Sequence, residues 1–145
     1  MFTGQYQHNL DTKNRLTLPS KLAEALSTNI YLSKGFDECL EIRTEAEFNK
    51  YSEKLLSYSS NSNDVRKIQR VFFSMSSKIE IDSNKRILIP TNLLEISGIT
   101  KAVILVGVGE TIEVWDEEKF KKYLNEATKQ YEIVAEKIAG GKNEK

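Results

Sequence analysis

Cysteine and histidine are nearly absent from this sequence, and their scarcity excludes whole classes of protein. The single cysteine, Cys39, cannot form an internal disulfide framework and fits a reducing cytosol. The single histidine, His8, leaves no second histidine or cysteine pair to complete a zinc site. No apolar run approaches the roughly 18 residues of a membrane span, and no basic-then-apolar signal peptide begins the chain. We therefore expect a cytoplasmic protein without membrane, metal or cofactor.

Net charge of either sign is also lacking, because 21 basic residues balance 21 acidic ones. This balance argues against a general polyanion binder. The distribution is uneven, however. Residues 64–90 hold six basic side chains against three acidic ones, whereas residues 37–53 hold six acidic against two basic. A neutral protein can carry one basic face, and charge asymmetry of this kind is typical of nucleic-acid binding.

Catalytic patterns are missing too. Glu117 and Glu118 form a carboxylate pair, but they begin a predicted helix, where acids interact favourably with the helix dipole. The sequence has no nucleophile–base pairing and no glycine-rich phosphate loop. We predict that the protein is not an enzyme, has no catalytic residue and takes no small-molecule substrate.

Proline occurs only twice, and both prolines end copies of one repeated motif. The first copy spans residues 11–19 (DTKNRLTLP) and the second residues 82–90 (DSNKRILIP). Each reads acid, three residues, arginine, aliphatic, any residue, aliphatic, proline. The repeat continues past the proline, since residues 35–42 align with residues 107–114. Two copies of one supersecondary unit therefore make up most of the chain.

Alternating apolar and polar residues predict the strands of each unit. In the first unit we expect a strand over 5–10, the motif turn, a helix over about 20–27, and a hairpin of 29–34 with 39–43. In the second unit we expect a strand over 78–81, the motif turn, a helix over 91–97, and a hairpin of 102–107 with 111–115. His8 falls at an inward position, in a core or an interface. Cys39 aligns with Thr111 and is interpreted as a small strand residue.

A helix is predicted after each hairpin. Thr44 and Glu47 form a capping box for the first, and Asp116 begins the second. The second carries an apolar stripe that either packs on its own chain or contacts a neighbouring subunit. The stripe comprises Phe120, Leu124, Ala127, Tyr131, Val134 and Ile138. Between the units we expect a polar loop over 57–63 and a helix over 64–73 capped by Asp64.

These elements predict four regions along the chain. They are a first repeat (1–56), a linker with a connecting helix (57–76), a second repeat with a C-terminal helix (77–138) and a disordered tail (139–145).

The turn of each motif offers chemistry suited to DNA. Arginine presents a planar fork that fits a phosphate or the edge of guanine, and asparagine has a donor and an acceptor that fit adenine. The candidate DNA-binding residues are Lys13, Asn14, Arg15, Asn84, Lys85 and Arg86. Alternatively, Asp11–Arg15 and Asp82–Arg86 are i,i+4 ion pairs that only fix a hairpin. Exposed pairs contribute about 0–1 kcal/mol, so turn-stabilising acids are compatible with DNA binding by their neighbours.

The duplicated motif resembles that of the MraZ family, and the resemblance covers about residues 1–138. Further segments strengthen it: Met1-Phe2-x-Gly4, Asn9-Leu10-Asp11, Arg70-x-Phe72-Phe73-Ser74 and Val114-Trp115-Asp116. The resemblance implies an α+β, mainly β fold of tandem AbrB/SpoVT-like swapped-hairpin β-barrel repeats, which form an intrachain pseudo-dimer with flanking helices.

The resemblance also implies a function. It suggests a sequence-specific, nucleoid-associated transcriptional regulator that binds double-stranded DNA at tandem short boxes. The boxes would lie in the promoter upstream of the division and cell-wall gene cluster, and the protein would form a homo-oligomeric ring. An antitoxin-like or purely oligomeric interaction protein on the same fold is the alternative.

The sequence departs from the family's pattern just before each motif arginine. The family commonly has glycine there, whereas this chain has Asn14 and Lys85. Lysine adopts a positive φ less readily than asparagine, so we expect the second turn to fit the family's backbone shape less well. Lys85 also adds a charge. We therefore expect base readout chiefly from the first turn and phosphate anchoring chiefly from Lys85 and Arg86.

Overall fold

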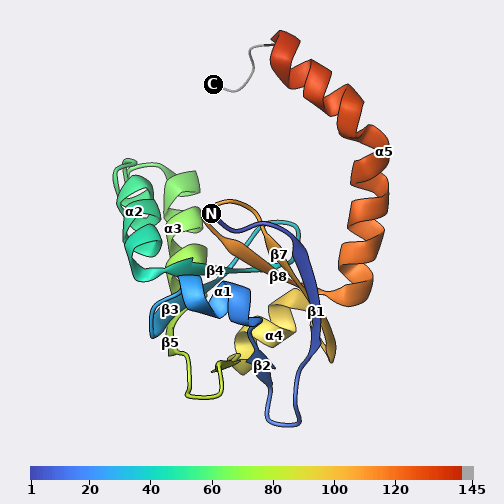
Figure 1. The fold of residues 1–145 in the computed structure, drawn as a ribbon. Helices are drawn as coiled ribbons and strands as arrows, with labels where there is room; N and C mark the ends of the chain where they lie inside the picture. Colours follow the sequence, from blue (N-terminus) through green and yellow to red (C-terminus); the bar gives the residue numbers. More distant parts are fainter. Residues whose placement is uncertain (142–145) are drawn as a thin grey trace.

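The computed structural model describes residues 1–141 (Figure 1). The strands are β1 (Gln5–Asn9), β2 (Arg15–Thr17), β3 (Asn29–Lys34), β4 (Leu40–Thr44), β5 (Ser76–Glu80), β6 (Arg86–Leu88), β7 (Ala102–Gly107) and β8 (Ile112–Asp116). The helices are α1 (Ser20–Ala25), α2 (Glu45–Leu56), α3 (Asn63–Ser74), α4 (Thr91–Ser97) and α5 (Glu117–Gly141).

The strands of the two repeats exchange partners in one antiparallel sheet of order β1-β7-β8-β4-β3-β5. β1 of the first repeat pairs with β7 of the second, where His8 lies opposite Val103. β5 of the second repeat pairs with β3 of the first, where Ile79 lies opposite Ile30. The two hairpins meet at the centre, where β4 pairs with β8. The repeats are therefore joined by hydrogen-bonded ladders and not merely by a linker.

β2 and β6 form a second, two-stranded antiparallel sheet, which we call the ribbon. Each of its strands is three residues long, and they pair only with each other. β1 and β5 therefore remain the two edges of the larger sheet, which is open. The mixed, mainly antiparallel fold with helices agrees with the prediction, but the closed β-barrel is not confirmed.

One hydrophobic core serves both repeats. Leu16 and Ile87 face each other across the ribbon, and both side chains are fully buried. Other fully buried members come equally from both repeats: Ile30, Leu32, Leu40 and Ile42 from the first, and Val103, Leu105, Ile112 and Val114 from the second. Burial of each such side chain contributes about 1.5–3 kcal/mol. Because the core is shared, neither repeat can bury its apolar residues alone.

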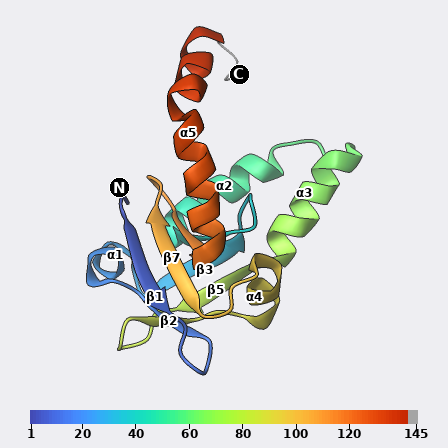
Figure 2. The ribbon, with the colours of Figure 1, turned by 90° about the vertical axis from the view of Figure 1, so that its right-hand side faces the viewer.

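α2 and α3 lie side by side and cover part of the sheet (Figures 1 and 2). The Phe48 ring on α2 stacks on Tyr31 of β3, with 3.8 Å between ring centroids. Phe72 on α3 packs against Phe48 and Tyr51 of α2, at centroid distances of 5.7 and 5.1 Å. The Gln69 side-chain amide donates to the Leu55 carbonyl at 3.0 Å. α3 thus covers the apolar face of α2.

Two helix boundaries differ from the predictions. α3 is capped by Ser62 and not by Asp64: the Ser62 hydroxyl accepts a hydrogen bond from the Val65 N–H, which places Asp64 in the first turn. α1 ends at Ala25, two residues early, because Leu26 is already extended. The Thr44 hydroxyl accepts from the Glu47 N–H, as the capping-box pattern predicts.

α5 rises away from the sheet, apart from the α2–α3 pair (Figure 1). It has 25 residues and is therefore roughly 37 Å long. Of the predicted stripe, Phe120 is buried, but Tyr131 is 74% exposed and Ile138 51% exposed. The stripe packs on its own chain only at the base of α5. The tail predicted at 139–145 begins on this helix, which continues to Gly141, and residues 142–145 lie outside the described residues.

The lone cysteine and histidine both lie within the fold. Cys39 precedes β4 and lies in the hairpin turn, not in a strand as predicted, and its thiol donates to the Phe36 carbonyl at 3.2 Å. Burial raises the pKa of this thiol. His8 is half-buried on β1. Within residues 1–141, no helix is both long and apolar enough to cross a membrane.

Candidate nucleic-acid interface

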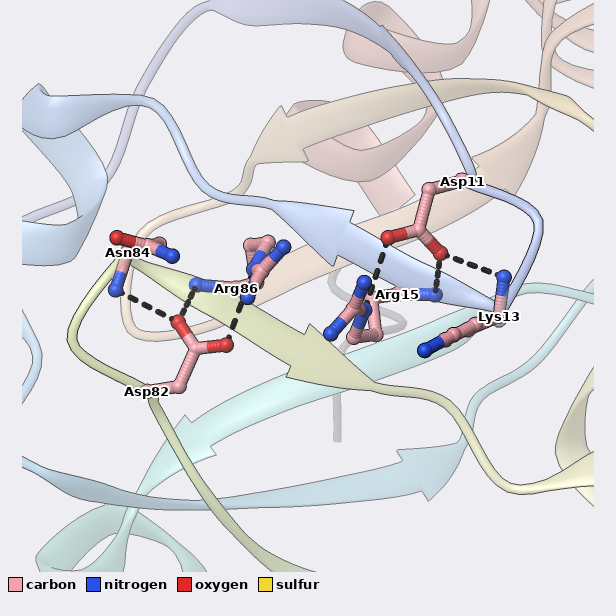
Figure 3. Close-up of polar contacts among 6 residues, drawn as sticks. All are labelled: Asp11, Lys13, Arg15, Asp82, Asn84 and Arg86. Atoms are coloured by element: carbon pink, nitrogen blue, oxygen red, sulfur yellow. Dashed lines mark hydrogen bonds and ion pairs between the residues drawn. The ribbon is translucent and has the colours of Figure 1, made fainter.

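The ribbon places the two motif arginines on one outward face (Figure 3). Arg15 lies opposite Leu88, and Thr17 lies opposite Arg86. Alternate strand residues point to opposite sides, so these four side chains share a face, and the residues between them point into the core. The arginines are diagonal neighbours across the pair, a relation that puts residues about 7–8 Å apart.

Asp11 fixes the first turn through its carboxylate. Its Oδ1 accepts hydrogen bonds from the N–H groups of Lys13 (2.8 Å) and Arg15 (2.9 Å). Its Oδ2 accepts from Arg15 Nε at 2.8 Å. The Asp11 N–H donates to the Arg15 carbonyl at 3.0 Å, and the Asn14 N–H to the Asp11 carbonyl at 3.1 Å. Within the described residues, the Arg15 guanidinium forms a hydrogen bond only through its Nε. Its Nη groups therefore remain available to a ligand.

The second turn repeats this arrangement around Asp82. Its Oδ1 accepts from the N–H groups of Asn84 (2.8 Å) and Arg86 (2.9 Å), and its Oδ2 accepts from Arg86 Nε at 3.0 Å. The Lys85 N–H donates to the Asp82 carbonyl at 3.0 Å. Both i,i+4 ion pairs expected from the sequence are therefore present, and each is part of a hydrogen-bonded turn.

The two turns are also joined to each other. The Leu18 N–H donates to the Lys85 carbonyl at 2.8 Å, and the Ile89 N–H donates to the Asn14 carbonyl at 3.0 Å. Each turn is thus tied to the strand of the other repeat, at opposite ends of the ribbon. A displacement of one turn would strain the strand of the other repeat, so the two turns form one rigid unit.

The prediction that the second turn would differ from the first in backbone shape is wrong. Asn14 and Lys85 both have φ of 62°. This is the left-handed region, which residues other than glycine, asparagine and aspartate rarely occupy. Lys85 adopts this conformation because its N–H and carbonyl both make hydrogen bonds that the ribbon fixes. The lysine therefore adds a charge at the position of Asn14 without changing the shape of the turn.

Backbone donors lower the pKa of both turn carboxyls. The largest cause for Asp11 is the hydrogen bond from the Arg15 N–H, and for Asp82 it is the hydrogen bond from the Arg86 N–H. The guanidinium groups act in the same direction, and burial acts against them. Both carboxylates are ionised at neutral pH, and each turn still carries net positive charge because a lysine and an arginine outnumber its acid.

All six candidate binding residues lie on these two turns. Lys13, Asn14, Asn84 and Lys85 are exposed, and the arginine side chains are 30% (Arg15) and 27% (Arg86) exposed. Lys85 Nζ also lies 3.3 Å from the hydroxyl oxygen of Ser20 at the start of α1.

Sequence reasoning missed two members of the outward face. Thr17 is exposed, and Leu88 is 57% exposed although it is aliphatic. Both follow an arginine by two residues, so strand alternation could have placed them beside it. Leu88 is a large apolar side chain on an otherwise polar surface, which suits contact with an apolar group of a ligand.

Within residues 1–141, no group of three or more His, Cys, Asp or Glu residues is arranged so that it could hold a metal ion.

The duplicated turn agrees with the comparison against protein families. The family model described as "MraZ protein, putative antitoxin-like" matches the chain twice, over residues 1–71 and 72–138. The chain belongs to the MraZ family. The two matches confirm the duplication inferred from the motif and the recognition of the family.

Curated MraZ relatives match this chain over nearly its whole length. A protein of Mesoplasma florum is 42% identical over 144 residues, which cover 99% of each chain. One of Mycoplasmoides gallisepticum is 45% identical over 127 residues, covering 88% of this chain and 89% of its own. One of Acetivibrio thermocellus is 40% identical over 139 residues, covering 96% and 97%. Each is named "Transcriptional regulator MraZ".

Proposed function

We propose that this protein is a sequence-specific transcriptional regulator that binds double-stranded DNA through the ribbon and its two turns. The observation that carries the proposal is the pair of Asp-anchored arginines, placed diagonally on one exposed face. The names of the MraZ relatives support it. We further infer that the strand exchange is the swapped-hairpin arrangement of AbrB-like domains, within the regions 1–56, 57–76 and 77–138.

The two-stranded form of the ribbon and its side chains support binding to DNA. A B-DNA major groove admits a two-stranded β-ribbon. The Nη groups of Arg15 and Arg86 can form paired hydrogen bonds with a guanine edge or grip a phosphate, and Asn14 or Asn84 can pair with adenine. Thr17 and Leu88, between the arginines, suit contact with a thymine methyl group.

A single protomer covers few base pairs, so we propose that several act together. Weak contacts at adjacent boxes reinforce one another through effective concentration. The proposed targets are tandem short boxes upstream of the division and cell-wall gene cluster, in the nucleoid. The proposed assembly is a closed homo-oligomeric ring, in which unlike surfaces of neighbouring chains meet. The exposed stripe of α5 supports such an assembly.

Binding to the native upstream region tests the proposal. Fluorescence anisotropy should show tighter binding to that fragment than to a scrambled duplex of equal length, and the Arg15→Ala/Arg86→Ala double variant should lose this binding. Lys54→Ala, which removes an exposed cation from α2, is the matched control and should bind as wild type does. Equal affinity for native and scrambled DNA, with a folded protein, would favour an antitoxin-like or purely interacting role instead.

A further inference from the structure

The two arginines of the ribbon have different neighbours across the strand pair. Arg15 lies opposite Leu88, and its counterpart Arg86 lies opposite Thr17. The alignment of the repeats makes the two arginines equivalent, and it also makes Thr17 equivalent to Leu88. The approximate symmetry of the ribbon is therefore broken on its outward face, where one arginine has a leucine beside it and the other a threonine.

Packing within the chain does not account for the leucine. Leu88 is 57% exposed, whereas its neighbours Ile87 and Ile89 are buried, and among the described residues it is not part of the hydrophobic core. It does not shield the arginine beside it either. The side chain of Arg15 is 30% exposed, and that of Arg86, which faces the smaller threonine, is 27% exposed. The leucine is thus free to contact a ligand.

Leu88 is also an isolated apolar group. No other large apolar side chain on the two ribbon strands is exposed, and the adjoining turns present lysine and asparagine side chains. Surfaces that bind other proteins expose contiguous apolar patches of several hundred Å². A single exposed leucine among polar side chains fits a small apolar group on a polar ligand better than it fits the apolar face of a protein.

The position of Leu88 relative to Arg15 is fixed by the backbone. The two residues are directly opposite each other, a relation that places Cβ atoms about 4.5–5.5 Å apart. The N–H of Ile89 donates to the Asn14 carbonyl at 3.0 Å, and the buried side chain of Ile87 anchors the strand on its inner side. The leucine and the guanidinium are therefore presented together on a rigid element, as precise recognition requires.

DNA offers a matched partner for an arginine with a leucine beside it. In the major groove an arginine forms paired hydrogen bonds with guanine, and thymine presents a C5-methyl group that apolar side chains contact. A leucine has no hydrogen-bonding atom in its side chain, so it would leave the donor or acceptor of another base edge unpaired. Threonine has a hydroxyl group as well as a methyl group and can contact any base.

We propose that Leu88 is a specificity-determining residue, which selects a thymine next to the base pair contacted by Arg15. Thr17, by contrast, leaves the equivalent position beside Arg86 open to any base. The inference rests on the proposed binding of DNA through the ribbon and names one base within the box. The two halves of the ribbon thus read their base pairs differently, although their turns have the same backbone shape.

Replacement of thymine by deoxyuridine tests this role, because it removes only the C5-methyl group and keeps every hydrogen-bonding atom. The probe is the native upstream fragment, in which one thymine position is replaced in all boxes at a time, and affinity is read by fluorescence anisotropy. At one position, wild type should bind the uracil fragment about fourfold more weakly per box, the effect of one buried methyl-sized group. At that position, Leu88→Ser should bind the thymine and uracil fragments equally.

Three further variants complete the design. Leu88→Met keeps a large apolar side chain and should keep the sensitivity to uracil. Thr17→Leu should create a second sensitive position, in the other half of the box. Leu56→Ser removes an exposed leucine from α2, outside the ribbon, and should respond to uracil as wild type does.

Two results would overturn the role of Leu88. One is a wild type that binds every uracil fragment as tightly as the native one. The other is a Leu88→Ser protein that keeps the full loss at the sensitive position, even if it binds all fragments more weakly. Failure of wild type to prefer the native fragment over a scrambled duplex would count against the proposed function itself, whereas that preference without any effect of the methyl group would count against the role of Leu88 alone.

Discussion

Single residues set the chemistry of the two turns, which carry equal charge and differ mainly in the position of the lysine: only in the second turn does it directly precede the arginine. Both turns have equivalent hydrogen bonds and a left-handed residue at the equivalent position, so we expect any difference in how they contact DNA to come from their side chains. The first turn has Lys13 and Asn14 before its arginine, and the second has Asn84 and Lys85. We expect Arg15 to contribute base readout and Lys85 to contribute phosphate anchoring.

Two alanine variants separate these roles. Loss of a paired base contact costs about 1–3 kcal/mol, roughly 5- to 150-fold in affinity, and relaxes specificity. Loss of a phosphate contact weakens all sequences alike and lowers the salt slope by about one unit. Arg15→Ala should therefore reduce the difference in affinity between cognate and scrambled tandem boxes. Lys85→Ala should leave this difference unchanged and should weaken the dependence of the affinity on salt concentration. The reverse pattern would show that the assigned division of roles is wrong.

The turn carboxylates predict a pH dependence. Their folded-state pKa values are lowered by backbone N–H donors, so the ionised carboxylates stabilise the turns above the unfolded pKa of about 4. This stabilisation is lost as the pH falls through the lowered values. Thermal unfolding should show wild type with a higher Tm than Asp11→Asn/Asp82→Asn at pH 7, and the difference should shrink below pH 4. A difference that stays constant with pH would contradict this assignment.

At the residue scale, much of the candidate nucleic-acid interface could be predicted, because the residues of each turn are close together in the sequence. The acid and the arginine of each motif are four residues apart, and they meet within one turn. The neighbours Thr17 and Leu88 were not assigned, because their shared face depends on the pairing of β2 with β6, 71 residues further along the chain. The shape of the second turn was also missed, since one of the two backbone hydrogen bonds that hold Lys85 at positive φ comes from Leu18 of the other repeat.

At the scale of elements, the close approach of residues 2–4 to the end of β7 depends on Gly107. Phe2 and Gly109 exchange backbone hydrogen bonds of 2.7 and 2.9 Å, and the Gly107 N–H donates to the Gly4 carbonyl at 2.9 Å. A Cβ at Gly107 would lie 2.3 Å from the backbone nitrogen of Thr3, whereas one at Gly109 would meet nothing. The end of β7 therefore requires glycine so that residues 2–4 can approach it.

Gly107→Ala should displace this segment and destabilise the protein by about 1–3 kcal/mol, the range for overpacked sites. Chemical denaturation measures the change. Gly140→Ala is the control, because a Cβ there meets nothing and alanine is favoured in a helix by roughly 0.5–1 kcal/mol. If Gly107→Ala unfolds at the wild-type denaturant concentration, the segment does not lie where the structure places it.

The positions of the strands and helices could be predicted from periodicity, but the way in which the strands combine into sheets could not. The ranges of β3, β7 and α4 agree with the predictions because alternation and Gly98 mark them locally, whereas β4 and β8 begin and end one residue later than predicted. The closed barrel is not confirmed, since the larger sheet is open; closure depends on which sheet edges meet, and the local alternation of residues does not specify that. The cap of α3 was misplaced because Ser62 and Asp64 are equally good capping residues.

At the scale of the whole molecule, the exchange of strands makes the two repeats one body with two turns. The shared core and the cross-repeat hydrogen bonds fix the spacing of Arg15 and Arg86. One protomer then presents a small, rigid, doubly basic surface. On the proposed function, we expect such a surface to bind DNA weakly alone and strongly when several copies engage one DNA molecule.

The most direct test of DNA binding by several rigid protomers is a titration of DNA duplexes that carry one, two and four boxes at native spacing. The duplexes are kept at equal length with scrambled filler, and affinity is read by fluorescence anisotropy at fixed salt. Binding should be weak for one box and should become steeper and tighter with two or more, with each gain lost when the spacing is shifted by half a helical turn. Equal affinity for one box and for the correctly spaced array would contradict the account.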